Sequence, residues 1–215
     1  MKIITEKYIS ALSHLPKEGK YIVGHQAENE IVVYQAYRPA IADFAVTNQF
    51  LGGADYSYKR MSWIKPNFLW MMYRSGWATK EGQERILALW ISQEDFENIL
   101  SQAVLSSFDP KYYGSYDHWK KDLDTKEVRL QWDPDHDPYG SKLARRAIQL
   151  GLKGQTLETF AKKQLRLIEG ITDFVAQQKK YVDSRDIDKL IIPIETVYHL
   201  TNNELRARAG ADRII

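Results

Sequence analysis

The stretch from Glu30 to Asn48, EIVVYQAYRPAIADFAVTN, decides the fold. Its first part is rich in β-branched and aromatic residues, which is typical of a buried strand. Pro39 follows at a position where proline favours the first turn of a helix. The stretch therefore predicts a strand from Glu30 to Tyr37, followed at once by a helix from Pro39 to Asn48.

The same pattern recurs further along the chain. Residues Arg85 to Ile91, RILALWI, predict a second buried strand, and Gln93 to Ala103 predicts a helix with Ser92 as its N-cap. The remaining elements expected from periodicity and turn residues are helices over 4–15, 67–74, 141–150 and 156–182, strands over 127–132 and 190–200, and a loop over 107–121.

These elements predict an α+β fold with a mixed or antiparallel sheet flanked by helices. With 215 residues, of which 44% are hydrophobic, the chain is expected to form a single compact domain. Residues 1–20 would add an N-terminal helix and turn, and residues 201–215 would form a polar C-terminal tail.

Charge and composition exclude several classes of function. Lys and Arg total 30 against 28 for Asp and Glu, so the bulk charge of +2 does not indicate a general DNA coat or a membrane-surface protein. The absence of cysteine excludes disulfides, cysteine nucleophiles and thiolate metal sites. The sequence has neither the long apolar run of a signal peptide nor that of a membrane span, so we expect a cytoplasmic protein without membrane contact.

One block of the chain combines aromatic rings with fixed positive charge. It runs from Arg60 to Arg85, RMSWIKPNFLWMMYRSGWATKEGQER. Such a pairing suits a nucleotide whose base stacks on a ring while its phosphates meet the cations. The residues that carry this hypothesis are Arg60, Trp63, Lys65, Arg74 and Trp77. The alternative is that the rings fill the core while the basic groups reach solvent.

A second candidate site is the acidic turn from Val128 to Gly140, VRLQWDPDHDPYG. Pro138 and Ala144 occupy the positions where an EF-hand requires Gly and Glu, so a calcium loop is excluded. Asp133, Asp135 and His136 could serve instead as base, orienter or weak Mg²⁺ ligands, and Arg145 and Arg146 follow on the expected helix. Arg129 and Gln131, on the polar face of the preceding strand, could orient a ligand, and no residue is assigned to a metal site. The alternative is a turn whose aspartates cap the next helix and pair with arginines.

Glu195 is the third candidate. It lies in the strand-like segment IIPIETVYHL, either at the solvent side of a strand or in a cleft of low dielectric. A catalytic glutamate and an edge-strand charge that maintains solubility both fit this pattern.

Five motifs together resemble a known but uncharacterised family, domain of unknown function 4291. They are VYQAY (33–37), RMSWIKPNFLWMMYRSGWA (60–78), QERILA (83–88), VRLQWDPDHD (128–137) and RAIQLGL (146–152). The resemblance spans nearly the whole chain and implies no activity. The family usually carries an Arg-containing segment before the first strand, whereas this chain has Gly24-His25-Gln26-Ala27 there.

The order of the parts is also similar to the layout of ADP-ribosyltransferases, at the level of the fold alone. That likeness implies NAD as a ligand, with Tyr34 and Gln35 on the early strand and Glu195 on the late strand. The middle aromatic or hydroxyl residue could be Tyr56, Tyr58 or Tyr73.

We therefore hypothesise a transferase that binds NAD or a related nucleotide and acts on nucleic acid or protein. Glu195 and Asp133 are the catalytic candidates. The nucleotide-binding candidates are Tyr34, Gln35, Arg60, Trp63, Lys65, Arg74, Trp77, Arg129, Gln131, His136 and Arg146. Two alternatives remain open: a non-catalytic module for RNA or single-stranded DNA, and a scaffold that binds proteins. Oligomeric state cannot be inferred from this pattern.

Overall fold

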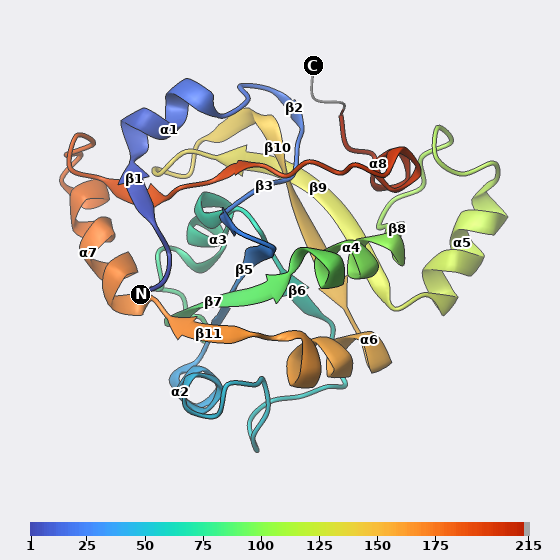
Figure 1. The fold of residues 1–215 in the computed structure, drawn as a ribbon, viewed down its shortest axis with the longest axis horizontal. Helices are drawn as coiled ribbons and strands as arrows, with labels where there is room; N and C mark the ends of the chain where they lie inside the picture. Colours follow the sequence, from blue (N-terminus) through green and yellow to red (C-terminus); the bar gives the residue numbers. More distant parts are fainter. Residues whose placement is uncertain (213–215) are drawn as a thin grey trace.

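A computed structural model describes residues 1–212 of the chain. Strand β5 (Glu30–Tyr37) lies inside an antiparallel sheet of order β11-β7-β5-β4 (Figure 1). The other strands of this sheet are β4 (Gln26–Ala27), β7 (Arg85–Ser92) and β11 (Leu167–Gly170). Ile31 belongs to one buried hydrophobic cluster and Val32 to another. Because both faces of β5 are covered, its sequence is apolar at consecutive positions rather than at alternate ones.

A second sheet of order β2-β10-β9-β8 is built around a long antiparallel hairpin. Its strands are β2 (Gly19–Lys20), β8 (Ala103–Leu105), β9 (Val128–His136) and β10 (Lys142–Leu152), and β6 (Ser62–Ile64) also pairs with β10. The two sheets are joined where the Tyr34 N–H donates to the Lys65 carbonyl oxygen at 2.7 Å. Two small antiparallel pairs complete the strands: β1 (Thr5–Lys7) with β12 (Ile191–Pro193), and β3 (Val23–Gly24) with β13 (Thr196–Val197).

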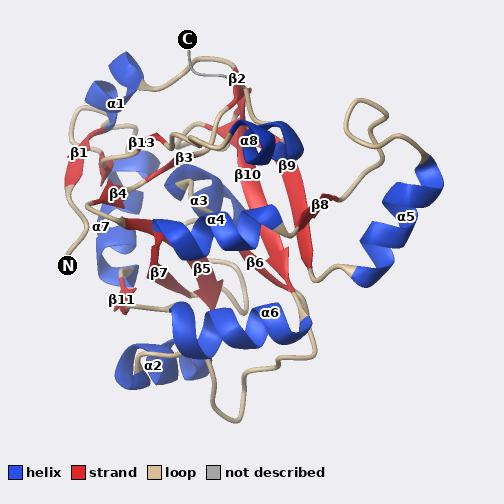
Figure 2. Cartoon of the chain, turned by 45° about the vertical axis from the view of Figure 1, so that its right-hand side comes forward, coloured by secondary structure: helices blue, strands red, loops and turns tan. Residues whose placement is uncertain are grey.

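Helices surround the two sheets. They are α1 (Tyr8–His14), α2 (Pro39–Asn48), α3 (Phe68–Ser75), α4 (Gln93–Ser101), α5 (Tyr116–Thr125), α6 (Gly154–Thr159) with the π-helical turn η1 (Phe160–Gln164), α7 (Thr172–Asp183) and α8 (Asn203–Ala209). Helix α2 packs on β7 and β11, while α5 stands away at the side of β8 (Figure 2). None of the helices over residues 1–212 has the length and apolar character needed to cross a membrane.

The α+β class is confirmed, and the opening stretch of sequence gave correct bounds for both β5 and α2. Strand β7 and helices α3 and α4 lie within a residue or two of their predicted positions. The Ser92 cap is also confirmed, because its hydroxyl accepts from the Asp95 N–H at 3.0 Å. In these elements local pattern and tertiary environment agree.

Two predicted helices are wrong. The segment Ser141–Leu150 is largely strand β10, paired with β9 through a bulge between Lys142 and Arg146. The segment Thr156–Val182 is interrupted by β11, which binds the open edge of β7. In both segments the spacing of apolar residues suits a helix, but part of the segment forms a strand of a sheet. The strand pairing overrides the local helix preference.

Four other bounds need correction. Residues 4–15 begin with strand β1, and residues 190–200 are divided into β12 and β13 on either side of Glu195. The expected loop over 107–121 ends in α5. The expected tail contains α8, whose N-terminal amides are capped by the Asn202 side chain. The last part of that tail, residues 213–215, lies outside the described residues.

Candidate functional site

A cleft with a volume of about 660 Å³ lies where the two sheets approach each other. Its walls come from the end of β5, the segment that leads to β6, helix α3 and the β9–β10 hairpin. The residues on which its chemistry depends are Gln35, Tyr37, Arg38, Asp55, Arg60, Ser62, Trp63, Lys65, Trp70, Arg74, Gln83, Gln131 and Gln149. Six of these were predicted from the sequence: Gln35, Arg60, Trp63, Lys65, Arg74 and Gln131.

Lys65 is a buried cation in this cleft, with 5% of the residue exposed. Its backbone is fixed by the bridge to Tyr34 and by Pro66, which favours an extended conformation at the preceding residue. Its ammonium group lies 5.3 Å from the centre of the Trp70 ring and has no hydrogen-bond acceptor or carboxylate partner among residues 1–212. Burial, assisted by the positive charge of Arg74, lowers the pKa of Lys65 to about 7, against a smaller opposing effect of Asp133.

Two further cations, Arg60 and Arg74, lie at the exposed rim of the cleft. Neither guanidinium forms an ion pair with a carboxylate in the described part of the chain. Arg38, which lies beside them, is engaged instead, because it pairs with Asp55 at 2.7 Å. The rim therefore presents two free planar forks of the kind that bind phosphate in a bidentate manner.

The floor of the cleft carries a polar triad on the β9–β10 hairpin. Gln131 and Gln149 are directly opposite each other, and their amide groups donate to the two carboxylate oxygens of Asp133 at 2.7 and 2.6 Å. Because a carboxylate only accepts, both amides must turn their NH₂ groups toward Asp133. Two amide oxygens are left as acceptors for hydroxyl or amino groups of a ligand.

Trp63 is half-buried on this floor. It is paired with Gly151 of β10, and a Cβ atom at residue 151 would lie 3.0 Å from the Trp63 ring and 2.7 Å from the Met61 sulfur. Glycine is therefore required for the indole to lie against the strand. Gln35 fixes the backbone at the same point, because its amide donates to the Trp63 carbonyl oxygen at 3.1 Å.

Five predicted binding residues do not line the cleft: Tyr34, Trp77, Arg129, His136 and Arg146. Tyr34 is fully buried on the other face of β5, and the Trp77 indole donates to the Pro138 carbonyl oxygen at 3.1 Å within the core. Arg129 donates to backbone carbonyls at the end of α5, including that of Lys126 at 3.0 Å.

His136 and Arg146 lie elsewhere on the hairpin. The His136 ring is stacked on Tyr73 with a centroid separation of 3.6 Å, and burial lowers its pKa. Arg146 is exposed on β10. The acidic turn instead contains a buried ion pair between Asp135 and Arg145, which corresponds to the alternative considered from the sequence.

Glu195, one of the two catalytic candidates, does not reach the cleft. It is 1% exposed, and its carboxyl group accepts from the Phe68 N–H at 2.7 Å and from the Asn67 amide at 3.3 Å. These are the first groups of α3, so Glu195 caps the helix that carries Trp70 and Arg74. Burial raises the pKa of Glu195 well above its ordinary value. The other catalytic candidate, Asp133, does not line the cleft either, but it accepts from Gln131 and Gln149, which do.

Replacement of Glu195 by glutamine is expected to stabilise the protein as pH rises. With a raised pKa, folded Glu195 retains its proton above pH 4.5 while the unfolded chain loses it, so wild-type stability falls with increasing pH. Glutamine does not titrate. Above pH 5 the variant should therefore gain stability relative to wild type in urea unfolding as pH rises, for as long as folded Glu195 retains its proton. The exposed Glu81→Gln should show no such trend, and a pH-independent difference for Glu195→Gln would contradict the assignment.

Several cleft residues were not predicted, among them Gln149, Gln83, Ser62 and the Arg38–Asp55 pair. Gln149 was missed because its segment was expected to be a helix. As a strand, that segment places Gln149 opposite Gln131, whose polar position on β9 was recognised. The register of a hairpin would have identified the residue.

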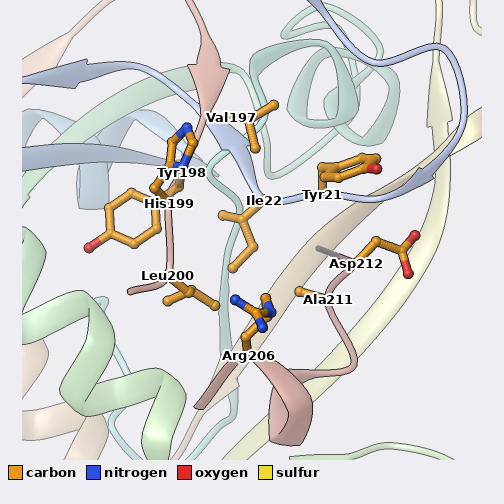
Figure 3. A pocket seen from close by; sticks show the side chains of 9 residues that line it. All are labelled: Tyr21, Ile22, Val197, Tyr198, His199, Leu200, Arg206, Ala211 and Asp212. Carbon is orange, nitrogen blue, oxygen red and sulfur yellow. The ribbon is translucent and has the colours of Figure 1, made fainter. Parts of the chain in front are cut away.

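A second, smaller cavity lies between β13 and α8 and has a volume of about 110 Å³ (Figure 3). Its lining includes Tyr21, His199, Arg206 and Asp212. It is too small for a nucleotide and borders Asp212, the last residue that the structure describes. No three His, Asp or Glu side chains within residues 1–212 are grouped in a way that could hold a metal ion.

Comparison with known proteins identifies the family. A search of curated proteins finds no significant match. The family model described as domain of unknown function (DUF4291) matches residues 21–198, a range that contains every cleft residue named above. The chain therefore belongs to the family of the domain of unknown function DUF4291.

Proposed function

We propose that the cleft binds a phosphate-bearing nucleotide of the NAD type and that the chain transfers a group from it to a nucleic acid or protein. The observation that carries the proposal is a set of three cations, Arg60, Lys65 and Arg74, that have no carboxylate partner within residues 1–212 and surround one half-buried tryptophan. A buried or clustered cation without a counter-ion is unfavourable in the empty protein, so an anionic ligand is the partner that this arrangement suits.

The chemistry of the walls fits the parts of a nucleotide. The two guanidinium forks of the rim suit phosphate oxygens. The Trp63 ring, held flat against Gly151, can stack on a base, an interaction worth about 1–3 kcal/mol. The two amide oxygens oriented by Asp133 suit the hydroxyl groups of a ribose.

Size and burial favour this function over the two alternatives. A volume of about 660 Å³ is within the range of small-molecule sites. It suits one nucleotide ligand better than several consecutive nucleotides of a single-stranded nucleic acid. The rings that a protein-binding scaffold would need are inside: Trp70 is 6% and Trp77 is 9% exposed. Tyr73 is the exposed ring of this block and Trp63 is half-buried, which is less aromatic surface than an extended protein interface would need.

Calorimetric titration tests the proposal, with ATP, ADP, NAD, ADP-ribose, inorganic phosphate and a short RNA as separate ligands. We expect at least one nucleotide to bind, and Arg60→Ala and Arg74→Ala each to weaken it about tenfold, the loss of one charge-assisted contact. Lys59→Ala is the matched control, since Lys59 is exposed next to the cleft and does not line it.

Three results would contradict the proposal. These are the absence of heat with every nucleotide on folded protein, equal weakening by the Lys59 control, and RNA binding that is steeply salt-dependent without competition from mononucleotides. The last result would favour the nucleic-acid module.

A further inference from the structure

Lys65 is the one amine in the cleft that is free to act as a nucleophile. The nearby carboxylates and the Tyr37 hydroxyl are bound to other groups of the protein, and burial raises the pKa of the Tyr56 hydroxyl, which therefore stays a neutral phenol. Asp55 is paired with Arg38, Asp133 accepts from two glutamines, and the Tyr37 hydroxyl donates to the Gln35 amide oxygen at 2.9 Å. Within the described residues, the Lys65 nitrogen has no hydrogen-bond or ion-pair partner and lies over the Trp70 ring, 5.3 Å from its centre. Because Lys65 is more than nine-tenths buried and lines the cleft, a molecule that reacts with its amine has to enter the cleft.

We propose that Lys65 is a covalent catalytic residue that captures the open-chain aldehyde of a phosphate-bearing ribose as an imine. This goes beyond the proposed function, on whose phosphate site it rests, by naming a second class of ligand beside the NAD-type nucleotide. That class is a nucleotide or sugar phosphate whose ribose has a free anomeric carbon. Ribose 5-phosphate and ADP-ribose are its simplest members.

The chemical step is balanced without a metal or a redox partner. The lone pair of the Lys65 amine attacks the aldehyde carbon, and the electrons of the carbonyl double bond move to its oxygen. The nitrogen loses a proton and the oxygen gains one, which gives a carbinolamine. Loss of water then forms the carbon–nitrogen double bond. This is the covalent catalysis that lysine performs on carbonyl substrates.

The surroundings of Lys65 support each requirement of this step. The amine must be uncharged to attack, and burial together with the Arg74 charge lowers the pKa of Lys65 to about 7. The negative charge of Asp133 acts in the opposite direction on this pKa, with a smaller effect. The phosphate would be held at the rim by Arg60 and Arg74, and the sugar hydroxyls would meet the amide oxygens of the triad.

Reductive trapping tests the proposal directly. The protein is incubated at pH 7 with ribose 5-phosphate or ADP-ribose, sodium borohydride is added, and the modified peptide is identified by mass spectrometry. We expect one modified lysine, Lys65, with saturation as ligand increases and a severalfold loss in Arg74→Ala. Ribose without phosphate should label weakly. NAD should protect without labelling, because both of its anomeric carbons are bonded to a base.

A second measurement separates this inference from the proposed function. Acetic anhydride is uncharged and needs no phosphate site, so the acetylation rate of each lysine against pH reports its reactivity alone. At pH 7 about half of Lys65 should be uncharged, against about one part in three thousand for an ordinary lysine. We expect Lys65 to react at least about tenfold faster than Lys59, with half-maximal reactivity near pH 7.

The outcomes of the two measurements are distinct. Nucleotide binding without rapid acetylation or trapping at Lys65 would overturn the inference and leave the proposed function in place. Rapid acetylation of Lys65 without any nucleotide binding would overturn the proposed function. Trapping that is spread over many surface lysines at equal rates would contradict the assignment of Lys65.

Discussion

Replacement of Lys65 by methionine is expected to stabilise the folded protein at pH 7 by on the order of 4 kcal/mol. Lys65 is buried, and its pKa is lowered from 10.5 to about 7 mainly by that burial. Each pKa unit of this shift is a free-energy cost of keeping the side chain charged in the folded protein. Methionine fills a similar volume beside Trp70 and has no charge to desolvate.

The stabilisation should depend on pH in a defined direction. Below pH 7 both folded and unfolded Lys65 bind a proton, so the cost of the buried charge is present in full. Between pH 7 and pH 10.5 the unfolded chain retains the proton while the folded protein has lost it, so wild-type stability rises with pH. The advantage of Lys65→Met is therefore largest at or below pH 7 and should shrink by more than half at pH 9.5.

Urea unfolding of wild type and variant at pH 7 and pH 9.5 measures both effects. Lys65→Arg keeps a charge at every pH and should give no stabilisation. Lys59→Met, at an exposed site in the same segment, should stay within about 0.5 kcal/mol of wild type. A destabilised Lys65→Met would contradict the unpaired, desolvated state of this amine.

A gain in stability from the loss of one side chain would also bear on function. Natural sequences seldom retain an unpaired buried charge in a core, and the places where they do are commonly binding or catalytic sites. If Lys65→Met is more stable than wild type and also fails to bind nucleotide, the wild-type protein retains a destabilising buried amine because that amine is needed for binding in the cleft.

The parts of the fold that could be predicted are those in which local pattern and burial agree. Strand β5 is apolar at consecutive positions because both its faces are covered, and α2 begins at a proline that fits its first turn. Strand β10 and the segment around β11 could not be predicted in the same way. Strand β11 pairs with β7 from a distant part of the chain, and β10 pairs with distant β2 and β6 as well as with its neighbour β9. Single-sequence periodicity contains no information about these pairings.

The candidate site divides along similar lines. Residue type and spacing identified the cations Arg60, Lys65 and Arg74, because charge among aromatic rings is unusual in any context. Which rings face the cleft could not be predicted, since Trp63 and Trp77 differ only in what packs on them: Gly151 for the first and the Pro138 carbonyl for the second.

Replacement of Asp135 by alanine is expected to destabilise the protein by about 3–5 kcal/mol, the range for one partner lost from a buried ion pair. Asp135 is 1% and Arg145 is 6% exposed. One carboxylate oxygen of Asp135 accepts two bonds from the guanidinium, at 2.8 and 2.6 Å, and the other accepts the His136 N–H at 2.8 Å. The variant would leave the Arg145 charge buried with only the Pro16 carbonyl oxygen as a partner, at 2.6 Å.

A double variant, Asp135→Leu with Arg145→Met, distinguishes the cost of leaving Arg145 unpaired from the cost of lost packing. If the loss in Asp135→Ala comes from the stranded guanidinium, the double variant should recover most of the stability in urea unfolding at pH 7. Equal losses in single and double variants would instead assign the effect to packing.

Asp135 and Lys65 are both buried charges, and their expected effects have opposite signs. The Asp135 carboxylate has a charged partner within the protein and its removal is costly, whereas the Lys65 amine has no such partner among the residues that the structure describes and its removal is favourable. Only the amine therefore calls for a partner from outside the chain.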